Sequence, residues 1–271
     1  MDSFFAAQLV GYEKIQDIFN KKIQDNQLHH ALLFSGYEGS GKRKLCLELA
    51  KTLLIHNANN ITLEIEKHPD VKIITPNLEE SKKGEITVKQ IRALNSFLQL
   101  KSGFSDCKII ILDAVDNLNH NAANSLLKIL EEPPEKSYFL CLSHNPHKLL
   151  DTIKSRVLNI KLPNLTKGQT KNIVSELGLK AEDIELALEF FPHQPGKIVE
   201  IIESKALNYK ATIISLLDSK SVAEREGLIQ KCNLKDNHLF GILNELISNE
   251  IYLIVKSGKI QKNHDEILSL W

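Results

Sequence analysis

The chain has 271 residues, enough for about two domains and for a core that hides about three-quarters of the unfolded surface. Its 34 basic and 34 acidic side chains cancel, and 42% of its residues are hydrophobic. This balance excludes an acidic tail and a generally basic nucleic-acid coat. The composition therefore predicts an ordinary soluble globular protein.

Cysteine spacing and the absence of a long apolar segment bear on the compartment. Cys46, Cys107, Cys141 and Cys232 lie at least 34 residues apart, so they form no C-x-x-C pair. The chain contains no stretch of about 18 apolar residues, and its opening lacks the basic-then-apolar order of a signal peptide. We therefore expect a reduced, cytoplasmic protein without a zinc site.

The first half of the chain alternates between two kinds of hydrophobic pattern. Apolar residues at helical spacing open the chain between Ile15 and Ile23. Short apolar runs predict buried strands at 31–35, 71–74, 109–112 and 138–142, and helical patterns occupy 44–55, 88–100 and 122–132. Strands that alternate with helices predict an α/β fold with a mostly parallel sheet.

The pattern changes near Leu162 and Pro163, because helical periodicity without strand-like runs follows. We place one domain boundary there, after residue 163. A second break lies near 204–208, where a helical series begins again with Tyr209. The predicted domains are residues 1–163, 164–207 and 208–271.

A glycine-rich loop joins the strand 31–35 to the next helix. Residues 36–43 fit the phosphate-loop pattern G-x-x-x-x-G-K-[ST] at seven of eight positions. Its candidate nucleotide-binding residues are Gly36, Gly39, Ser40, Gly41, Lys42 and Arg43. Loop N–H groups, the helix N-terminus and Lys42 can hold the phosphates of ATP or ADP, whereas the alternative is a glycine-rich turn with an incidental lysine. Arg43 replaces the hydroxyl residue that binds Mg²⁺, which puts metal placement in question.

An acidic residue follows the strand 109–112. Asp113 stands at the sheet edge where α/β proteins bind ligands, although it could instead cap the helix that follows. Hydrolysis also needs a carboxylate that deprotonates water, and Ala114 occupies that position. Asp116 lies two residues too far along the chain. The sequence therefore predicts a nucleotide site that does not hydrolyse ATP.

Five motifs resemble those of AAA+ clamp-loader subunits, and within them the delta-prime family of bacterial DNA polymerase III. They are Leu28-His-His-Ala-Leu-Leu33, His68-Pro-Asp70, Ile109-Ile-Ile-Leu-Asp-Ala-Val-Asp116, Asn121-Ala-Ala-Asn-Ser-Leu-Leu-Lys-Ile-Leu-Glu-Glu-Pro-Pro134 and Ser155-Arg156-Val157. The resemblance covers residues 8–163. It implies an AAA+ P-loop domain over 1–163, a small helical lid over 164–207 and a helical C-terminal collar, which mediates oligomerisation, over 208–271.

The resemblance also implies a function in DNA replication. Such a subunit belongs to a heteropentamer with a motor ATPase subunit and a delta subunit, within a DNA-directed DNA polymerase (nucleotidyltransferase) holoenzyme. The assembly loads the sliding clamp onto primer-template DNA, with no membrane involved. By position, Ser155 and Arg156 match the motif that donates an arginine finger to a neighbouring ATP site; the alternative for Arg156 is a surface or intramolecular salt bridge.

The resemblance extends more loosely to two further positions. Ser143 falls where the family's first sensor lies, or is simply a polar strand end. Lys197 lies near the second-sensor position, but the alignment there is loose and we favour a solvated helix lysine. The four-cysteine zinc module of some relatives is missing, so we expect His56 and His68 to be exposed polar residues rather than ligands.

Three functions compete. The favoured one is a non-hydrolysing loader subunit that supplies Arg156 in trans. The alternative is a motor-type clamp-loader ATPase that binds ATP at the loop 36–43. A direct DNA-binding module is disfavoured by balanced charge and by an aromatic content of 6%.

Overall fold

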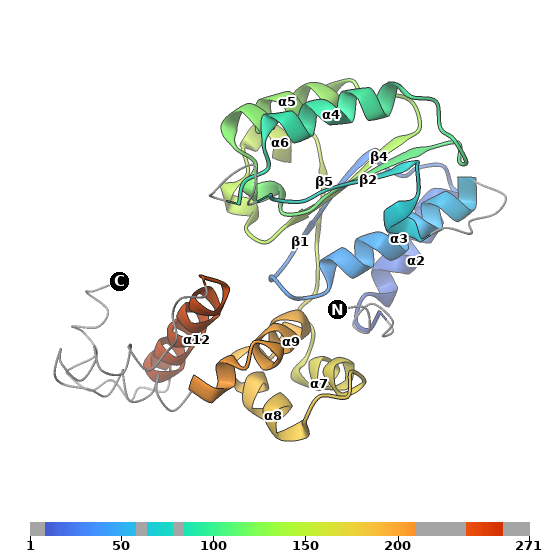
Figure 1. Cartoon of the computed structure of the whole chain (residues 1–271). Coiled ribbons are helices and arrows are strands. Elements are labelled where there is room, and N and C mark those ends of the chain that lie inside the picture. Colours follow the sequence, from blue (N-terminus) through green and yellow to red (C-terminus); the bar gives the residue numbers. More distant parts are fainter. Residues whose placement is uncertain (1–8, 58–63, 78–83, 210–236, 257–271) are drawn as a thin grey trace. The chain divides into compact units, whose positions relative to one another are not determined.

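The computed structural model describes residues 9–57, 64–77, 84–209 and 237–256, which fall into two compact units, Met1–Leu165 and Thr166–Trp271 (Figure 1). Within these described residues, no helix combines the length and apolarity needed to span a membrane. The two units are described separately below.

The first unit is built on a five-stranded sheet in which every pair of neighbouring strands is parallel. The strand order is β2-β3-β4-β1-β5, with β1 at Ala31–Ser35, β2 at Val71–Ile74, β3 at Lys108–Leu112, β4 at Ser137–Ser143 and β5 at Leu158–Lys161. Ser35 pairs in register with Ser143, so the carboxyl ends of β1 and β4 lie together. The four predicted strands are confirmed, whereas the edge strand β5 has no apolar run and was not expected.

Helices cover both faces of this sheet (Figure 1). On one face lie α4 (Val88–Gln99), α5 (His120–Glu131) and the short α6 (Asp151–Lys154), and on the other lie α2 (Glu13–Gln24) and α3 (Lys42–Asn57). Side-chain caps begin α4 and α5, because Thr87 accepts the N–H of Gln90 and Asn119 accepts that of Ala122. These layers confirm the predicted α/β architecture.

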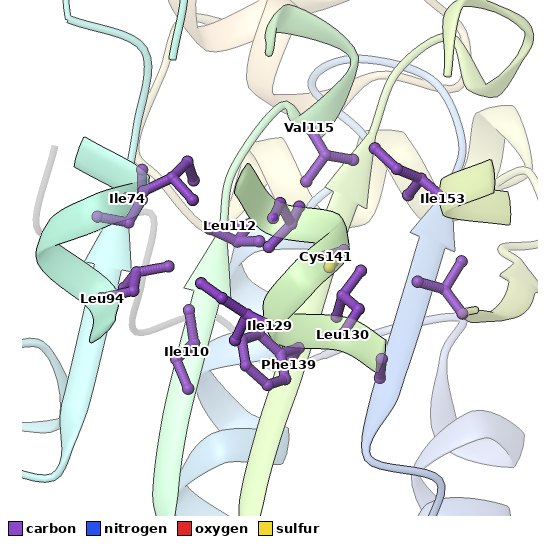
Figure 2. Packing of buried hydrophobic residues seen from close by; sticks show 14 of the residues in the cluster. Ile74, Leu94, Ile110, Leu112, Val115, Ile129, Leu130, Phe139, Cys141 and Ile153 are labelled. Atoms are coloured by element: carbon purple, nitrogen blue, oxygen red, sulfur yellow. The ribbon is translucent and has the colours of Figure 1, made fainter. Parts of the chain in front are cut away.

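The core explains why β1 and β3 consist almost entirely of apolar residues. All five residues of β1 and of β3 are buried, because helices pack on both faces of a parallel sheet. Figure 2 shows the layer between the sheet and the α4/α5 face, in which Ile110 and Leu112 of β3 and Phe139 of β4 meet Leu94 and Ile129.

The second unit is helical in its described part. It contains α7 (Lys167–Ser175), α8 (Ala181–Phe190), α9 (Pro195–Glu203), the 3₁₀ turn η4 (Ala206–Tyr209) and α12 (Asn237–Lys256). Buried apolar residues of α8, α9 and α12, among them Leu188, Ile198 and Leu246, share one core. Residues 210–236 lie outside the described part, so the predicted series after Tyr209 and the division into lid and collar at 207 stay predictions.

Candidate phosphate loop and arginine site

The glycine-rich loop lies between the end of β1 at Ser35 and the start of α3 at Lys42. Gly39 and Gly41 adopt left-handed backbone conformations, with φ of 72° and 92°, which other residues rarely take. The buried Tyr12 hydroxyl donates a 2.8 Å hydrogen bond to the carbonyl of Ser40 and so tethers the loop to the chain before α2. The sequence therefore folds here as strand, tight loop and helix.

The Lys42 side chain folds back into its own loop. Its Nζ donates to the carbonyls of Gly36 and Tyr37 at 2.8 and 2.5 Å, and lies 3.0 Å from Nδ1 of His144. Burial lowers the pKa of Lys42 to about 8. Burial, together with the charge of Lys42, also lowers the pKa of His144. Two nitrogen bases thus face each other inside the loop, an environment that disfavours a second positive charge.

Arg43 makes a cluster of opposite charges at the start of α3. Nη1 lies 3.4 Å from Oδ2 of Asp113, and Nη2 lies 3.1 Å from Oε1 of Glu66. The interpretation of Asp113 as a helix cap is wrong, because Asn119 caps α5. Asp113, at the carboxyl end of β3, instead pairs with the Arg43 guanidinium, which also pairs with Glu66.

Ala114 directly precedes a 3₁₀ turn, η2 (Val115–Asn117), and Asp116 lies within that turn. The carboxylate of Asp116 accepts the backbone N–H groups of His144 and Asn145, each at 3.1 Å. Asp116 thereby fixes the segment that follows β4 and brings His144 to Lys42. Sequence reasoning missed His144, although its place directly after a predicted strand end offered a signal.

Ser143 ends β4 beside the loop. Its backbone carbonyl accepts the N–H of Gly36 at 3.3 Å, and its side chain is fully buried. The structure therefore brings the candidate residues of the loop, Asp113 and Ser143 together around the carboxyl ends of β1, β3 and β4.

Arg156 lies at a separate place in the same unit, just after α6. Nη1 donates to the carbonyl of Thr152 at 2.8 Å and to Oγ of Ser155 at 3.2 Å, and Nη2 lies 2.6 Å from Oε1 of Glu131. A third of the Arg156 side chain remains exposed. The guanidinium is therefore fixed at the ends of α5 and α6, and its partners include none of the phosphate-loop residues.

Two sequence interpretations need correction. Lys197 is not solvated: it is buried at the start of α9, and its Nζ contacts Glu200 at 3.2 Å and both oxygens of Glu245 at 3.0 and 3.1 Å. His68 is not exposed either: it is buried, and its Nδ1 accepts the N–H of Asp70 at 3.2 Å. His56 is exposed as expected. Within the described ranges, no three His, Cys, Asp or Glu side chains gather as a metal site.

The family model described as DNA polymerase III, delta subunit, matches residues 11–166. The chain is similar to DNA polymerase III subunit delta' of Bacillus subtilis, with 32% identity over 152 residues, 53% of this chain and 45% of the relative. The Pseudomonas aeruginosa delta' subunit is 36% identical over 144 residues, 49% of this chain and 43% of the relative. The tau/gamma subunit of Haemophilus influenzae is 34% identical over 171 residues, 60% of this chain and 24% of the relative. The chain thus aligns with less than half the length of each of these relatives.

Solved structures share the fold. A DNA polymerase III gamma subunit-related protein of Thermotoga maritima superposes with a TM-score of 0.51 at 23% identity, covering 89% of this chain and 78% of that one. The Holliday junction branch migration motor RuvB of the same organism gives 0.50 at 14% identity, covering 87% and 75%. With the parallel five-stranded sheet, this likeness confirms the predicted AAA+ α/β fold.

Proposed function

The chain belongs to the DNA polymerase III delta-prime subunit family, and we propose that it is a non-hydrolysing clamp-loader subunit that supplies Arg156 to a neighbouring ATPase subunit in DNA replication. The observation that carries this proposal is the fixed, partly exposed guanidinium of Arg156 beside Glu131. The degenerate phosphate loop supports the absence of hydrolysis.

Arg156 is held in a way that suits an arginine finger. A guanidinium has five N–H donors, and the contacts to Thr152, Ser155 and Glu131 use three of them. These contacts do not use the N–H of Nε or the second N–H of Nη2, and a third of the side chain is exposed. Because these contacts already restrict the side chain, little rotamer entropy would be lost on meeting a phosphate. Arginine fingers accelerate phosphoryl transfer by about 10³–10⁵ in other systems.

The chain's own phosphate loop lacks what hydrolysis needs. Ala114 has no side chain that could deprotonate water, and Asp116 is bound to the N–H groups of His144 and Asn145. Arg43 occupies the position of the Mg²⁺-binding hydroxyl. These features support a subunit that organises an assembly and acts on a partner's nucleotide.

The proposed partners follow from the family. They are a motor ATPase subunit and a delta subunit in a heteropentamer, and the assembly would act on the sliding clamp and on primer-template DNA. Cytoplasmic location is part of the same proposal.

The test is the DNA- and clamp-stimulated ATPase of the reconstituted loader, with wild-type chain, Arg156→Ala and each chain alone as a blank. Arg92→Ala is a matched control, because Arg92 is exposed on α4. We expect no ATP hydrolysis by the chain alone. We expect the ATPase rate of the assembly to fall by about a thousandfold or more with Arg156→Ala and to stay unchanged with Arg92→Ala. An unchanged rate in an assembly shown to be intact would mean that Arg156 is structural.

A motor-type ATPase is the second candidate, favoured by the retained strand, loop and Lys42 arrangement. Mg²⁺-dependent ATP turnover by the purified chain alone would support it and count against the first proposal.

A further inference from the structure

Buried polar atoms without a hydrogen-bond partner gather at the phosphate loop. In the part of the chain that the structure describes, four side-chain atoms are of this kind, and three of them belong to the loop region: Oγ of Ser40, Nε of Arg43 and Oγ of Ser143. The fourth, in Thr170, lies in the second unit. Native proteins rarely leave such groups unpaired, so a concentration at one place indicates a missing polar partner.

Two of the three residues, Ser40 and Ser143, lie beside Gly36 at the start of the loop. Oγ of Ser40 lies 3.9 Å from where a Cβ on Gly36 would stand, and the Ser143 carbonyl accepts the Gly36 N–H. The same Cβ would lie 3.9 Å from Cδ of Lys42, so the side chain of Lys42 occupies the space inside the loop. Lys42 thus takes the loop carbonyls as its own partners while the two hydroxyls have none.

The buried ammonium of Lys42 is only partly compensated by negative charge. Asp113, Glu38 and Asp116 raise the pKa of Lys42, but burial lowers it further, to about 8, and His144 lies 3.0 Å from the ammonium. An anion that displaced Lys42 from the carbonyls of Gly36 and Tyr37 would offer partners to the ammonium and to both serine hydroxyls.

A divalent cation does not fit here. Residue 43 offers a guanidinium instead of the hydroxyl that would bind Mg²⁺. Asp113, the other expected ligand, is turned to Nη1 of Arg43 at 3.4 Å. A dication at Asp113 would have to displace this like charge, which Glu66 also holds at 3.1 Å.

We propose that the loop of residues 36–43 binds a phosphate chain, as in a nucleoside diphosphate or pyrophosphate, without a divalent cation, and that Arg43 supplies the positive charge that Mg²⁺ supplies elsewhere. This inference goes beyond the proposed function, since it concerns the chain's own loop rather than Arg156 and a partner's nucleotide.

The test is titration calorimetry of the full chain with ADP, ATP and inorganic pyrophosphate, each in EDTA and in excess Mg²⁺. We expect binding in EDTA that is no tighter in Mg²⁺. Arg43→Thr removes the guanidinium and restores the hydroxyl, so its binding should weaken by about tenfold in EDTA and become tighter in Mg²⁺ than in EDTA. Arg92→Thr, on exposed α4, should bind as the wild type does.

The comparison of ADP with pyrophosphate shows whether the loop recognises a nucleotide or the phosphates alone. Equal affinity for pyrophosphate and ADP would mean that the phosphates alone are recognised, whereas much tighter ADP binding would assign a nucleotide. Lys42→Met should abolish binding in every arm, and circular dichroism would verify that both loop variants are folded. Binding that requires Mg²⁺, or no binding at millimolar ligand, overturns the inference and leaves the Arg156 assay unaffected.

Discussion

Nη2 of Arg156 lies 2.6 Å from Oε1 of Glu131, so the guanidinium proposed to act on a neighbour's phosphate is paired with a carboxylate of its own chain. About half of the Glu131 side chain is exposed, and such a pair is worth at most about 1 kcal/mol to folding. For function, the pair matters because the Glu131 carboxylate would compete with a neighbour's γ-phosphate for the Arg156 guanidinium.

Glu131→Gln should therefore favour the assembly's reaction at low ATP. The amide keeps the size and an acceptor oxygen but removes the charge, which releases Arg156 for the phosphate. We expect the KM for ATP of the reconstituted loader to fall about two- to fivefold, with little change in the chain's unfolding free energy. Glu132→Gln, at the neighbouring exposed position, is the control. A loss of activity resembling that of Arg156→Ala would show instead that Glu131 orients the finger.

Asp70 should be among the most costly residues to replace in the first unit. Its fully buried carboxylate accepts the N–H groups of Gly103, Phe104 and Ser105 at 2.8–2.9 Å and pairs with Nζ of Lys108 at 3.1 Å. Asp70→Ala leaves these N–H groups and the buried Lys108 ammonium without their acceptor. We therefore expect the unfolding free energy, measured with denaturant, to fall by about 3–5 kcal/mol. Asp106→Ala, in the same loop but exposed, should cost less than about 1 kcal/mol; equal losses would contradict this account.

The same carboxylate gives a pH dependence with a definite sign. Burial alone would raise the pKa of Asp70, but the three backbone N–H groups, followed by Lys108, hold it well below its ordinary range. A depressed pKa means that the contribution is complete above the unfolded value of about 3.9 and is lost as the pH falls through the folded value. The stability difference between wild type and Asp70→Asn should therefore narrow below about pH 4. A difference that stayed constant from neutral pH to pH 2 would argue against this assignment.

Lys197 should hold α12 to α9 in the second unit. Its buried ammonium contacts both oxygens of Glu245, which lies on α12, and one oxygen of Glu200. Lys197→Met leaves the two partly exposed carboxylates facing each other, so the amides of α12 should exchange with deuterium faster by about tenfold or more. Lys180→Met, at an exposed position before α8, should leave that exchange unchanged. Unchanged exchange in Lys197→Met would show that apolar packing alone fixes α12.

The sequence predicted features with a local signal and missed those that depend on distant partners. Continuous apolar runs revealed β1 and β3, whereas β5 has two apolar and two polar residues, is mostly exposed, and pairs with the edge of β1. The burial of Lys197 could not be foreseen, since Glu245 lies 48 residues away. The substitution at Arg43 was visible, but its contact with Asp113 joins residues 70 positions apart. Pairings of this kind arise from tertiary structure and leave no local pattern.

The buried Lys42 predicts a pH dependence of the same sign as that of Asp70, but in an alkaline pH range. Burial lowers its pKa to about 8, so the folded state holds this proton less tightly than the unfolded chain does. Around it, Asp113, Glu38, Asp116 and Cys46 favour the protonated form of Lys42, and His144 lies 3.0 Å from the ammonium. Below pH 8 the folded chain carries the full cost of the buried charge, and between there and the unfolded value of about 10.4 that cost is progressively removed.

The stability of wild type relative to Lys42→Met should therefore rise with pH from about 8 to 10, as measured by denaturant unfolding at each pH. The control is Lys51→Met, because Lys51 is exposed on the same helix, and we expect no such pH trend for it. Lys44 is buried and therefore cannot serve as the control. Saturating pyrophosphate in EDTA should flatten the Lys42 trend, because a bound anion raises the pKa of the ammonium. If the unfolding free energies of wild type and Lys42→Met ran parallel across this pH range, Lys42 would titrate as an ordinary surface lysine. Its ammonium would then not be held against the carbonyls of Gly36 and Tyr37.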